Sequence, residues 1–291
     1  MPFNYTKPQG TLGTRALAGS LHAFGVLVLC GLPLAANSAP PDVPAGYKLV
    51  WADEFDVDGL PDPARWAYDT GMNKTGWHNH ELQYYSGPRK QNAVVQGGKL
   101  IISARKESLS QAPDWGGQRY TSTRLLTQGK RDWTYGFFEI RAKLPCGKGT
   151  WPAIWMLNSP AVWPAGGELD IVEHLGSDPG RVFSTVHTSA GNGGSGVGGA
   201  VRVPDACRAF HRYQMHWTAD RVSFGVDGFS YMHYPRLDVG PRAWPFDAPQ
   251  FLILNIAVGG DLGGEVDDRI FPVQMEVDYV RVYQAEKHAK P

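Results

Sequence analysis

Residues 163–176 of the chain read WPAGGELDIVEHLG. This stretch places three carboxylates, those of Glu168, Asp170 and Glu173, within six residues. Successive side chains of a β-strand point to opposite faces, so on a strand Glu168 and Asp170 share one face and Leu169 points to the other. The pattern indicates a strand with acids on one face and apolar packing on the other.

Glu173 breaks this alternation. It follows Glu168 by five residues and would face the core of a regular strand, where an unpaired carboxylate is too costly to expect. One extra residue, a β-bulge within residues 171–173, would return it to the face of the other acids. We therefore predict a bulged strand with all three carboxylates on one face.

The spacing of the two glutamates indicates a chemistry. At about 3.3 Å per residue their Cα atoms would lie about 13 Å apart, and side chains leaning together would bring the carboxyls within several ångströms. Carboxyls about 5–5.5 Å apart suit a nucleophile and a general acid/base around a glycosidic bond, whereas inversion needs more room for water. The geometry favours hydrolysis with retention.

Two simpler interpretations of the acids remain open at this point. In an amphipathic helix Asp170 and Glu173 would form an exposed i, i+3 pair, and on a strand the carboxylates would be no more than a solvated face. Pro164 and Gly166 before the acids and β-branched Ile171 among them disfavour the helix. The surrounding sequence must decide the rest.

Strand periodicity continues on both sides of this stretch. Residues 137–144 alternate as a half-buried strand does, and residues 213–217 repeat the pattern. Residues 222–228 end in an Asp-Gly hairpin signal. Residues 251–258 form an apolar run, as an inner strand buried on both faces would.

Many short strands with Gly and Pro turns, and no alternation of strands with helices, favour an all-β sandwich or jelly roll. The 291 residues include 35 Gly and 22 Pro, and 42% are hydrophobic, enough for a core. No linker or repeat follows residue 45. We expect one domain at residues 45–285 and a short tail at 286–291.

The charge balance disfavours two classes of partner. The chain has 28 Lys and Arg against 28 Asp and Glu. Without the N-terminal segment, which contains Lys7 and Arg15, 26 basic residues face 28 acidic ones, a formal charge of −2. This balance carries no electrostatic footprint for nucleic acid or an anionic membrane.

The N-terminal segment has the form of a signal peptide. Residues 1–41 carry two basic and no acidic side chains, and an apolar run at 21–36 precedes a small-residue cleavage site at 36–38. The alternative is an uncleaved anchor, but a histidine and a proline interrupt the run, which is short for a bilayer span. We expect a signal peptide at 1–38 and a secreted product, extracellular or periplasmic, with no membrane association after cleavage.

Export would place Cys146 and Cys207 in an oxidising compartment, where an isolated pair of thiols can form a disulfide. The sequence leaves open whether their Cα atoms lie within bonding range. The disulfide is therefore a hypothesis for the structure to test.

Seven ordered blocks resemble glycoside hydrolase family 16, in its bulged, laminarinase-like branch. The first is the acid stretch GELDIVE together with the preceding WPAIWML. The others are VWADEF at 50–55, WHNHELQYY at 77–85, YTSTRL at 120–125, YGFFEIRAKLP at 135–145, NIAVGG at 255–260 and VDYVRVY at 277–283. The resemblance covers the whole expected domain, which it identifies as a family 16 catalytic domain.

This resemblance implies a fold and a division of roles. The family fold is a β-jelly roll sandwich of two curved antiparallel sheets, concanavalin A-like, with the cleft on the concave face. By position in the motif Glu168 is the nucleophile, Glu173 the general acid/base, and Asp170 the residue that tunes Glu168 and hydrogen-bonds it. The charge of Glu168 would raise the pKa of Glu173, as like charges at close range do.

Substrate binding is expected to rest on aromatic faces, which pack against the apolar face of a glucose ring. A single Trp is more often core than platform, so the resemblance alone promotes the Trp residues nearest the acids. The residues so implied are Trp151, Trp155 and Trp163, with Asn79, Arg124 and His187 as contacts to sugar hydroxyls.

The resemblance also implies a structural calcium ion on the outer face, with Asp278 as a ligand; the alternative is that Asp278 is an ordinary exposed strand charge. No cofactor is expected to be required. A cupin-like metal centre at His78 and His80 is a weaker alternative, because cupins also need a Glu a few residues further on and Glu81 is adjacent.

Three residues depart from the family pattern: Phe137 where an Arg is common, His78 where a Gly often precedes the Asn, and Leu262 where a Trp often stands at the cleft. The last would weaken one sugar subsite. These differences bear on subsite preference, not on the reaction.

The sequence therefore predicts a secreted, retaining endo-β-glucanase that hydrolyses internal β-1,3 bonds of β-1,3-glucan (laminarin) or mixed-linkage β-1,3-1,4-glucan. Its partner is a polysaccharide, and we expect a monomer. The alternatives are a family 16 agarase or other galactan hydrolase and a non-catalytic glucan-binding module. The presence of all three acids disfavours the module, and the Trp-Pro run before Glu168 favours glucan.

Overall fold

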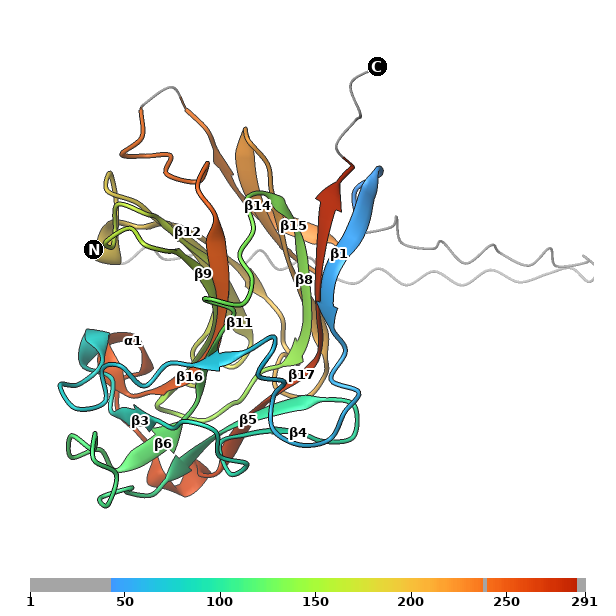
Figure 1. The fold of residues 1–291 in the computed structure, drawn as a ribbon. Helices are drawn as coiled ribbons and strands as arrows, with labels where there is room; N and C mark the ends of the chain where they lie inside the picture. The colour runs from blue at the N-terminus through green and yellow to red at the C-terminus, as the bar shows by residue number, and fades with distance from the viewer. Residues whose placement is uncertain (1–42, 238–239, 287–291) are drawn as a thin grey trace, which may run out of the picture. The chain divides into compact units, whose positions relative to one another are not determined.

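The computed structural model describes residues 43–237 and 240–286. The predicted signal peptide at 1–38 and residues 287–291 of the predicted tail lie outside the described residues. The described chain is almost entirely β-structure, and Figure 1 shows its strands arranged in two sheets that face each other. This arrangement confirms the predicted all-β sandwich.

The larger sheet has ten strands, in the order β15-β14-β13-β8-β17-β5-β6-β3, with β1 paired to β17 and β4 paired to β5. The pair β3–β6 is parallel, a local departure from the predicted antiparallel sheets. The strands of the larger sheet are β1 (Tyr47–Asp53), β3 (Gln83–Tyr85), β4 (Ala93–Val95), β5 (Leu100–Lys106), β6 (Tyr120–Ser122), β8 (Gly136–Lys143), β13 (His211–Trp217), β14 (Arg221–Val226), β15 (Phe229–Pro235) and β17 (Val273–Ala285).

The smaller sheet has seven antiparallel strands in the order β12-β11-β10-β9-β16-β7-β2. They are β2 (Ala67–Tyr68), β7 (Arg124–Leu126), β9 (Thr150–Asn158), β10 (Glu168–His174), β11 (Arg181–His187), β12 (Val197–Arg202) and β16 (Gln250–Val258). The helical turns are η1 (His78–His80), η2 (Gly193–Ser195), α1 (Gly260–Gly263) and η3 (Asp268–Ile270). No helix in the described ranges is long and apolar enough to cross a bilayer.

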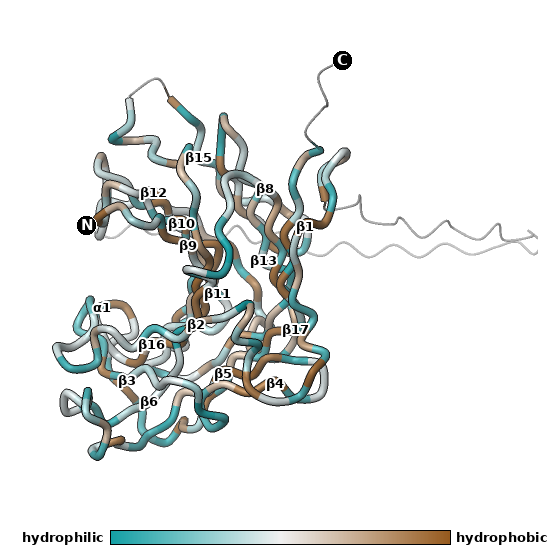
Figure 2. Tube along the Cα trace, viewed as in Figure 1, coloured by the Kyte–Doolittle hydropathy of each residue, from teal (hydrophilic) through white to brown (hydrophobic). Residues whose placement is uncertain are grey.

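The core lies between the sheets, and Figure 2 shows hydrophobic residues along the strands with hydrophilic residues in many of the connecting loops. Strand β16 is buried along its whole length, which confirms the predicted inner strand. One face, with Leu252 and Leu254, joins the main core. The other, with Phe251 and Ile253, forms a second apolar cluster with Leu126. The part of β16 around Phe251 and Ile253 is thus packed on both faces.

Strand β8 is more buried than its alternation predicts. Phe137 and Glu139, on the face expected to be solvated, are each 5% exposed. The carboxylate of Glu139 accepts hydrogen bonds from Gln214 Nε2 and Tyr279 OH, each at 2.7 Å. The ring of Phe137 packs near His216. Neighbouring strands of the same sheet cover this face, which periodicity along one strand cannot reveal.

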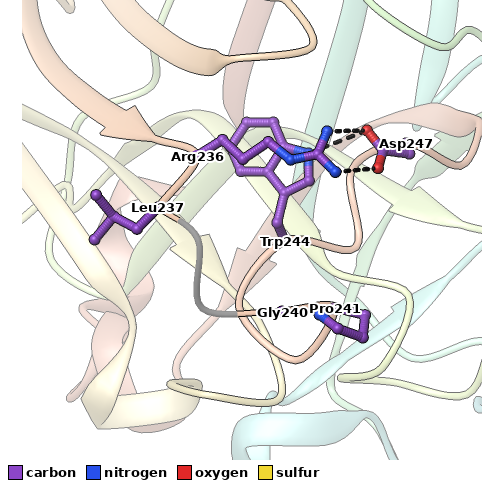
Figure 3. A pocket seen from close by; sticks show the side chains of 6 residues that line it. All are labelled: Arg236, Leu237, Gly240, Pro241, Trp244 and Asp247. Atoms are coloured by element: carbon purple, nitrogen blue, oxygen red, sulfur yellow. Dashed lines mark hydrogen bonds and ion pairs between the residues drawn. The ribbon is translucent and has the colours of Figure 1, made fainter.

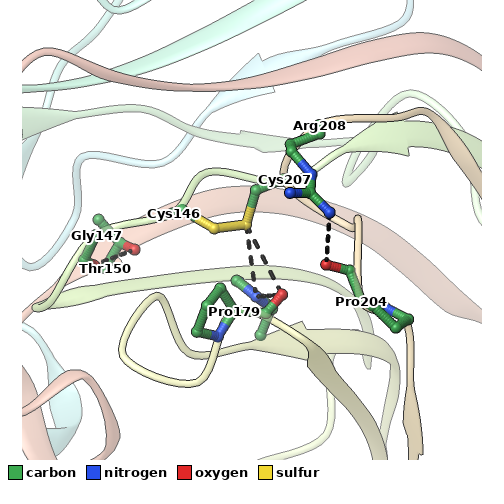
Figure 4. Close-up of a disulfide and its surroundings, with 8 residues drawn as sticks. Cys146, Gly147, Thr150, Pro179, Pro204, Cys207 and Arg208 are labelled. Atoms are coloured by element: carbon green, nitrogen blue, oxygen red, sulfur yellow. Dashed lines mark hydrogen bonds between the residues drawn. A yellow bond between two sulfur atoms is a disulfide. The ribbon is translucent and has the colours of Figure 1, made fainter.

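Cys146 and Cys207 form a disulfide, which confirms the hypothesis (Figure 4). Their Cα atoms lie 5.7 Å apart although the two cysteines are 61 positions apart in the sequence. The bond ties the segment after β8 to the segment between β12 and β13. The buried ring of His174, at the end of β10, lies beside it, with Nε2 4.0 Å from Cys207 Sγ. The disulfide therefore secures the region where β10 ends.

Candidate active site

A cleft of about 890 Å³ lies on the face of the smaller sheet that points away from the main core. Cleft-facing residues of β9, β10, β11 and β16 form its floor, and their neighbours along each strand point into the core. Residues of η1, α1 and η2 and the loop between β9 and β10 line its edges. Glu168, Asp170 and Glu173 all line this cleft.

The predicted bulge in β10 is confirmed. Between Asp170 and Glu173, β10 has two residues where its partner β11 has one. Against β9 the register shifts between Asp170 and Val172, which identifies Ile171 as the extra residue. Ile171 and Val172 are each 1% exposed in the core. The bulge thus lets three acids share the cleft face while the apolar residues between them stay buried.

Glu168 and Asp170 form a linked pair on the floor of the cleft. Glu168 Oε2 accepts a hydrogen bond from Trp163 Nε1 at 2.5 Å. Asp170 is 3% exposed, and its Oδ2 lies 3.3 Å from His187 Nε2. One oxygen of each carboxyl and a ring nitrogen of His187 all lie within 4.8 Å of one another, which accords with the orienting role expected of Asp170.

Glu173 is held by two neutral donors. Its Oε1 accepts a hydrogen bond from Trp151 Nε1 at 2.9 Å, and its Oε2 accepts one from Thr185 Oγ1 at 3.2 Å. The side chain is 7% exposed. Both oxygens are therefore fixed in a largely buried position at the floor of the cleft.

All three carboxyls resist ionisation. Burial, followed by the charge of Asp170, raises the pKa of Glu168 to about 8. Burial also raises the pKa of Glu173 to about 7, with a smaller contribution from the charge of Glu168. The pKa of Asp170 is raised by burial and by the charge of Glu173. Near neutral pH the cluster therefore retains protons that it shares among its members.

The cause of the raised pKa of Glu173 differs from the prediction in one respect. The sequence attributed it to the charge of Glu168, and that charge does contribute. Desolvation is the larger cause, because Glu173 lies under the cleft surface between β9 and β11. The burial of Glu173 depends on the strands beside β10, so the acid motif alone could not predict it.

The structure brings together the six residues expected to bind substrate, since all of them line the cleft. Trp163 is 48% exposed, as a platform for a sugar ring needs to be. Trp151 is 9% exposed and donates to Glu173, so it acts on that carboxyl more than as an open platform. The residues are Asn79, Arg124, Trp151, Trp155, Trp163 and His187.

Arg124 is fixed between aromatic rings. Its guanidinium lies 4.7 Å from the centre of the Trp155 ring and 5.2 Å from that of Trp77, and its Nε lies 3.1 Å from Asp69 Oδ2. A guanidinium held in this way offers its remaining N–H groups in a set direction, which suits recognition of hydroxyl oxygens.

Thr185 and Asn255 are among the polar cleft residues that the sequence analysis did not predict as site residues. Thr185, which donates to Glu173, has the same strand parity as His187, and that alternation was the available signal. Asn255 is the one polar residue in the apolar run of β16. It accepts a hydrogen bond from Trp155 Nε1 at 2.7 Å and donates to Tyr85 OH at 2.9 Å. A lone Asn in a buried strand could have indicated this role.

Two of the three departures from the family pattern face the cleft. His78 and Leu262 line it, and Leu262 is 45% exposed. Phe137 lies instead in β8 of the larger sheet. Leu262 therefore occupies the place at the cleft edge that the sequence analysis assigned to it.

The expected calcium ligand does not fit a calcium site built from side chains. Asp278 Oδ2 lies 2.6 Å from Arg141 Nη1, so this carboxylate already forms an ion pair with a guanidinium. Calcium requires six to eight oxygen ligands. Among the described residues, Asp278 belongs to neither of the two side-chain groups with metal-ligand spacing.

Those two groups also disfavour a cupin-like centre. One joins His174 to the cysteines of the disulfide, and the other joins His187 to Glu168 and Asp170. Within the described residues neither group includes His78 or His80. The histidine pair of η1 is therefore part of the cleft edge and not of a clustered set of metal ligands.

A second cavity, of about 300 Å³, lies away from these acids (Figure 3). Arg236 contacts both carboxylate oxygens of Asp247 at 2.9 Å. Tyr135 OH and Trp244 Nε1 also donate to that carboxylate. The charges of this cavity are thus neutralised within it, unlike those of the cleft.

The comparisons with known proteins agree with this geometry. The chain is 49% identical over 276 residues to a β-glucanase from Rhodothermus marinus, covering 90% of this chain and 93% of that protein. The crystal structure of SCLam, a non-specific endo-β-1,3(4)-glucanase, superposes with a TM-score of 0.82 at 51% identity, covering 84% of this chain and 93% of that one. The laminarinase from Rhodothermus marinus superposes with a TM-score of 0.76 at 52% identity, covering 82% and 97%.

The family is identified by the match of most of the chain to a family model. Residues 79–281 match glycosyl hydrolases family 16, a span that contains the bulged strand, its three acids and all six cleft residues expected from the sequence. The chain belongs to glycosyl hydrolase family 16.

Proposed function

We propose that this protein is a secreted, retaining endo-β-glucanase that hydrolyses internal β-1,3 bonds of β-1,3-glucan or mixed-linkage β-1,3-1,4-glucan. The observation that carries the proposal is the bulged strand β10, which presents Glu168 and Glu173 on one floor of an open cleft. The kinship with β-glucanases and laminarinases supports the substrate class.

In the proposed first step, Glu168 attacks the anomeric carbon and forms a glycosyl-enzyme. Glu173 gives its proton to the departing glycosidic oxygen as that bond breaks. In the second step Glu173 accepts a proton from water, which attacks the anomeric carbon and releases Glu168. Two displacements at one carbon retain its configuration.

The pKa values of the free cleft do not by themselves assign these roles, because the pKa of Glu168 is raised to about 8 and that of Glu173 to about 7. The assignment rests on the positions of the two glutamates in the family motif. The reactive form needs one proton on the pair, held by Glu173, with Glu168 ionised. The raised pKa of Glu173, due chiefly to burial, keeps its proton available near neutral pH. The Trp163 indole and the neighbouring His187 lower the pKa of Glu168 against the effect of burial, and so favour its ionised form. Once Glu168 is glycosylated its charge disappears, and Glu173 ionises more readily for the second step.

The cleft walls support binding of a glucan chain. Trp163 and Trp155 offer aromatic surface to the apolar faces of sugar rings. Arg124, Asn79 and His187 offer polar groups to sugar hydroxyls.

The first test is release of reducing sugar by residues 39–291 from laminarin, mixed-linkage β-glucan, agarose and carrageenan, with Glu168→Gln beside the wild type. We expect release from laminarin that vanishes in the variant. Activity confined to a galactan would retain the mechanism and replace the substrate. Binding of laminarin without any hydrolysis would favour the glucan-binding module.

The stereochemistry has a separate test. NMR of the first-formed anomer should show the β-configuration, because the two displacements cancel. The α-anomer as first product would contradict the assignment of Glu168 as nucleophile.

Secretion and the monomeric state belong to the same proposal. Export is supported by the basic, then apolar, then small-residue order of the first 38 residues. N-terminal sequencing of the protein from the medium or periplasm tests cleavage near residue 38, and light scattering on the mature protein tests the monomer.

A further inference from the structure

Each sheet of the fold carries a bulge, and a chain of hydroxyl groups connects the two. In β10 the extra residue is Ile171, two positions before Glu173 in the sequence. In β15 the register against β14 shifts so that Tyr231 is the extra residue. Between these two positions lies Ser184 of β11, which is fully buried.

The two hydrogen bonds of the Ser184 hydroxyl have a fixed direction. Ser184 Oγ lies 2.8 Å from the carbonyl oxygen of Ile171 and 2.6 Å from Tyr231 OH. A carbonyl oxygen can only accept, so the single hydroxyl hydrogen of Ser184 points to Ile171. Tyr231 OH must then donate to Ser184. Burial raises the pKa of Tyr231 to about 12, so this donor keeps its proton across the range in which a glycosidase works.

The position of Ser184 explains why this matters for Glu173. Ser184 is the single residue of β11 that faces the two residues of the bulge. A bulge interrupts the ladder of hydrogen bonds and leaves backbone groups to be satisfied otherwise. If β10 became regular, its side chains would change faces, and Glu173 would turn toward the core. Both neighbours of Ser184 along β11 are related to Glu173. Thr185 donates a hydrogen bond to the Glu173 carboxylate, and Phe183 is the residue paired with Glu173 in the β10–β11 register.

We propose that Ser184 and Tyr231 are positioning residues, which hold the bulge of β10 and thereby fix Glu173 as the general acid/base. They touch no substrate and act through the carbonyl of Ile171. The proposal rests on the role proposed above for Glu173.

The test uses two substrates that differ in their need for an acid. Departure of a sugar from laminarin requires protonation, whereas a 2,4-dinitrophenyl β-glycoside of a laminari-oligosaccharide carries a leaving group that departs without it. For both substrates kcat/KM reports the first displacement. The variants are Ser184→Ala and Tyr231→Phe, each of which removes one hydroxyl from the chain.

We expect kcat/KM on laminarin to fall by at least about tenfold in each variant, part of the hundredfold or more that general acid catalysis supplies. On the aryl glycoside it should stay within about threefold of the wild type, because the nucleophile is undisturbed. Glu173→Gln should show the same difference in kcat/KM between the two substrates, with a larger loss on laminarin. Tyr231 is partly exposed on β15, so Tyr231→Phe is expected to fold and carries the test if Ser184→Ala does not.

The matched control is Ser103→Ala. Ser103 is a buried serine of β5 in the other sheet, and its Oγ accepts a hydrogen bond from Gln274 Nε2 at 3.2 Å. Its removal should leave kcat/KM on both substrates unchanged.

Two outcomes would overturn the proposal while the role of Glu173 stands: equal losses on both substrates, or laminarin activity within about twofold of wild type in Tyr231→Phe. If Glu173→Gln itself shows no difference between the substrates, the acid/base assignment fails and the positioning role fails with it.

Discussion

Strands β10 and β17 carry the same acidic pattern in opposite surroundings. Each has a Glu and an Asp two positions apart, Glu168 and Asp170 in β10 and Glu276 and Asp278 in β17, and each has a bulge close by. On β17 the acids meet cations: Lys99 and Lys143 contact Glu276, and Arg141 contacts Asp278. On β10 they meet the indoles of Trp151 and Trp163, the hydroxyl of Thr185 and the ring of His187.

The consequence appears in the pKa values. Burial alone would raise the pKa of Glu276, but Lys143 and Lys99 outweigh it and hold the pKa below its usual value. In the cleft burial prevails, and the pKa values of Glu168 and Glu173 rise. Paired acids of this kind stay ionised and stabilise the fold, whereas acids that are buried without a permanent cation keep protons to transfer.

The largest expected difference between the strands is in activity. Glu168→Gln should lower kcat on laminarin by at least about a thousandfold, because removal of a nucleophile leaves only binding and residual electrostatics. Glu276→Gln should stay within about twofold of wild type, since its charge serves the outer face. Reducing-sugar assays on both variants measure this, and comparable losses would erase the distinction between the strands.

Stability should change in opposite directions. Folding raises the pKa of Glu173, so the stability contributed by its protonated form is complete below the unfolded pKa and is lost as pH rises through about 7. At pH 8 Glu173→Gln should therefore raise Tm, by about 2–4 °C for each kcal/mol recovered. Glu276 has a lowered pKa, its contribution is complete at pH 8, and Glu276→Gln should lower Tm.

Calorimetry at pH 8 and pH 4 measures both effects. The gain from Glu173→Gln should shrink at pH 4, where the wild-type carboxyl is protonated as well. If Glu173→Gln and Glu276→Gln changed Tm in the same direction at pH 8, burial would not be the cause of the difference between the two acids.

A smaller effect is expected on the pH profile. After burial, the charge of Asp170 is the next cause of the raised pKa of Glu168. Asp170→Asn should therefore let Glu168 ionise at lower pH and move the acid limb of kcat/KM down by about half to one unit. Asp278→Asn is the matched change on β17 and should leave the profile in place. An acid limb that moves upward in Asp170→Asn would contradict this electrostatic role.

The smallest expected effect concerns calcium. Because Arg141 already contacts Asp278, exchanging millimolar calcium for EDTA should shift Tm by less than about 1 °C, below the change that 1 kcal/mol produces. Thermal unfolding of the wild type and Asp278→Asn measures it. Stabilisation of several degrees that disappears in Asp278→Asn would establish the ion that the family resemblance implies.

Local pattern was enough to predict much of the site. The parity of Glu168, Asp170 and Glu173 required a bulge, and the structure has one at Ile171. The apolar run at 251–258 predicted a strand buried on both faces, and β16 is one. These features follow from geometry along a single strand, where a period of two assigns each side chain to a face.

Other features depend on neighbours that are distant in the chain. The burial of Glu139 comes from Gln214 and Tyr279, and the support of the β10 bulge comes from Ser184 and Tyr231. Periodicity gives no information on which strand will lie alongside.

The fold class, the strand that carries the acids and the face on which they lie could be predicted from the sequence, because these features depend on backbone geometry and alternation. Which acids contact a cation, how deeply each acid is buried and which hydroxyls hold the bulge depend on the packing of strands that are distant in the sequence. Charge neutralisation and desolvation arise between strands, and they separate the proton-transferring Glu173 from the structural Glu276.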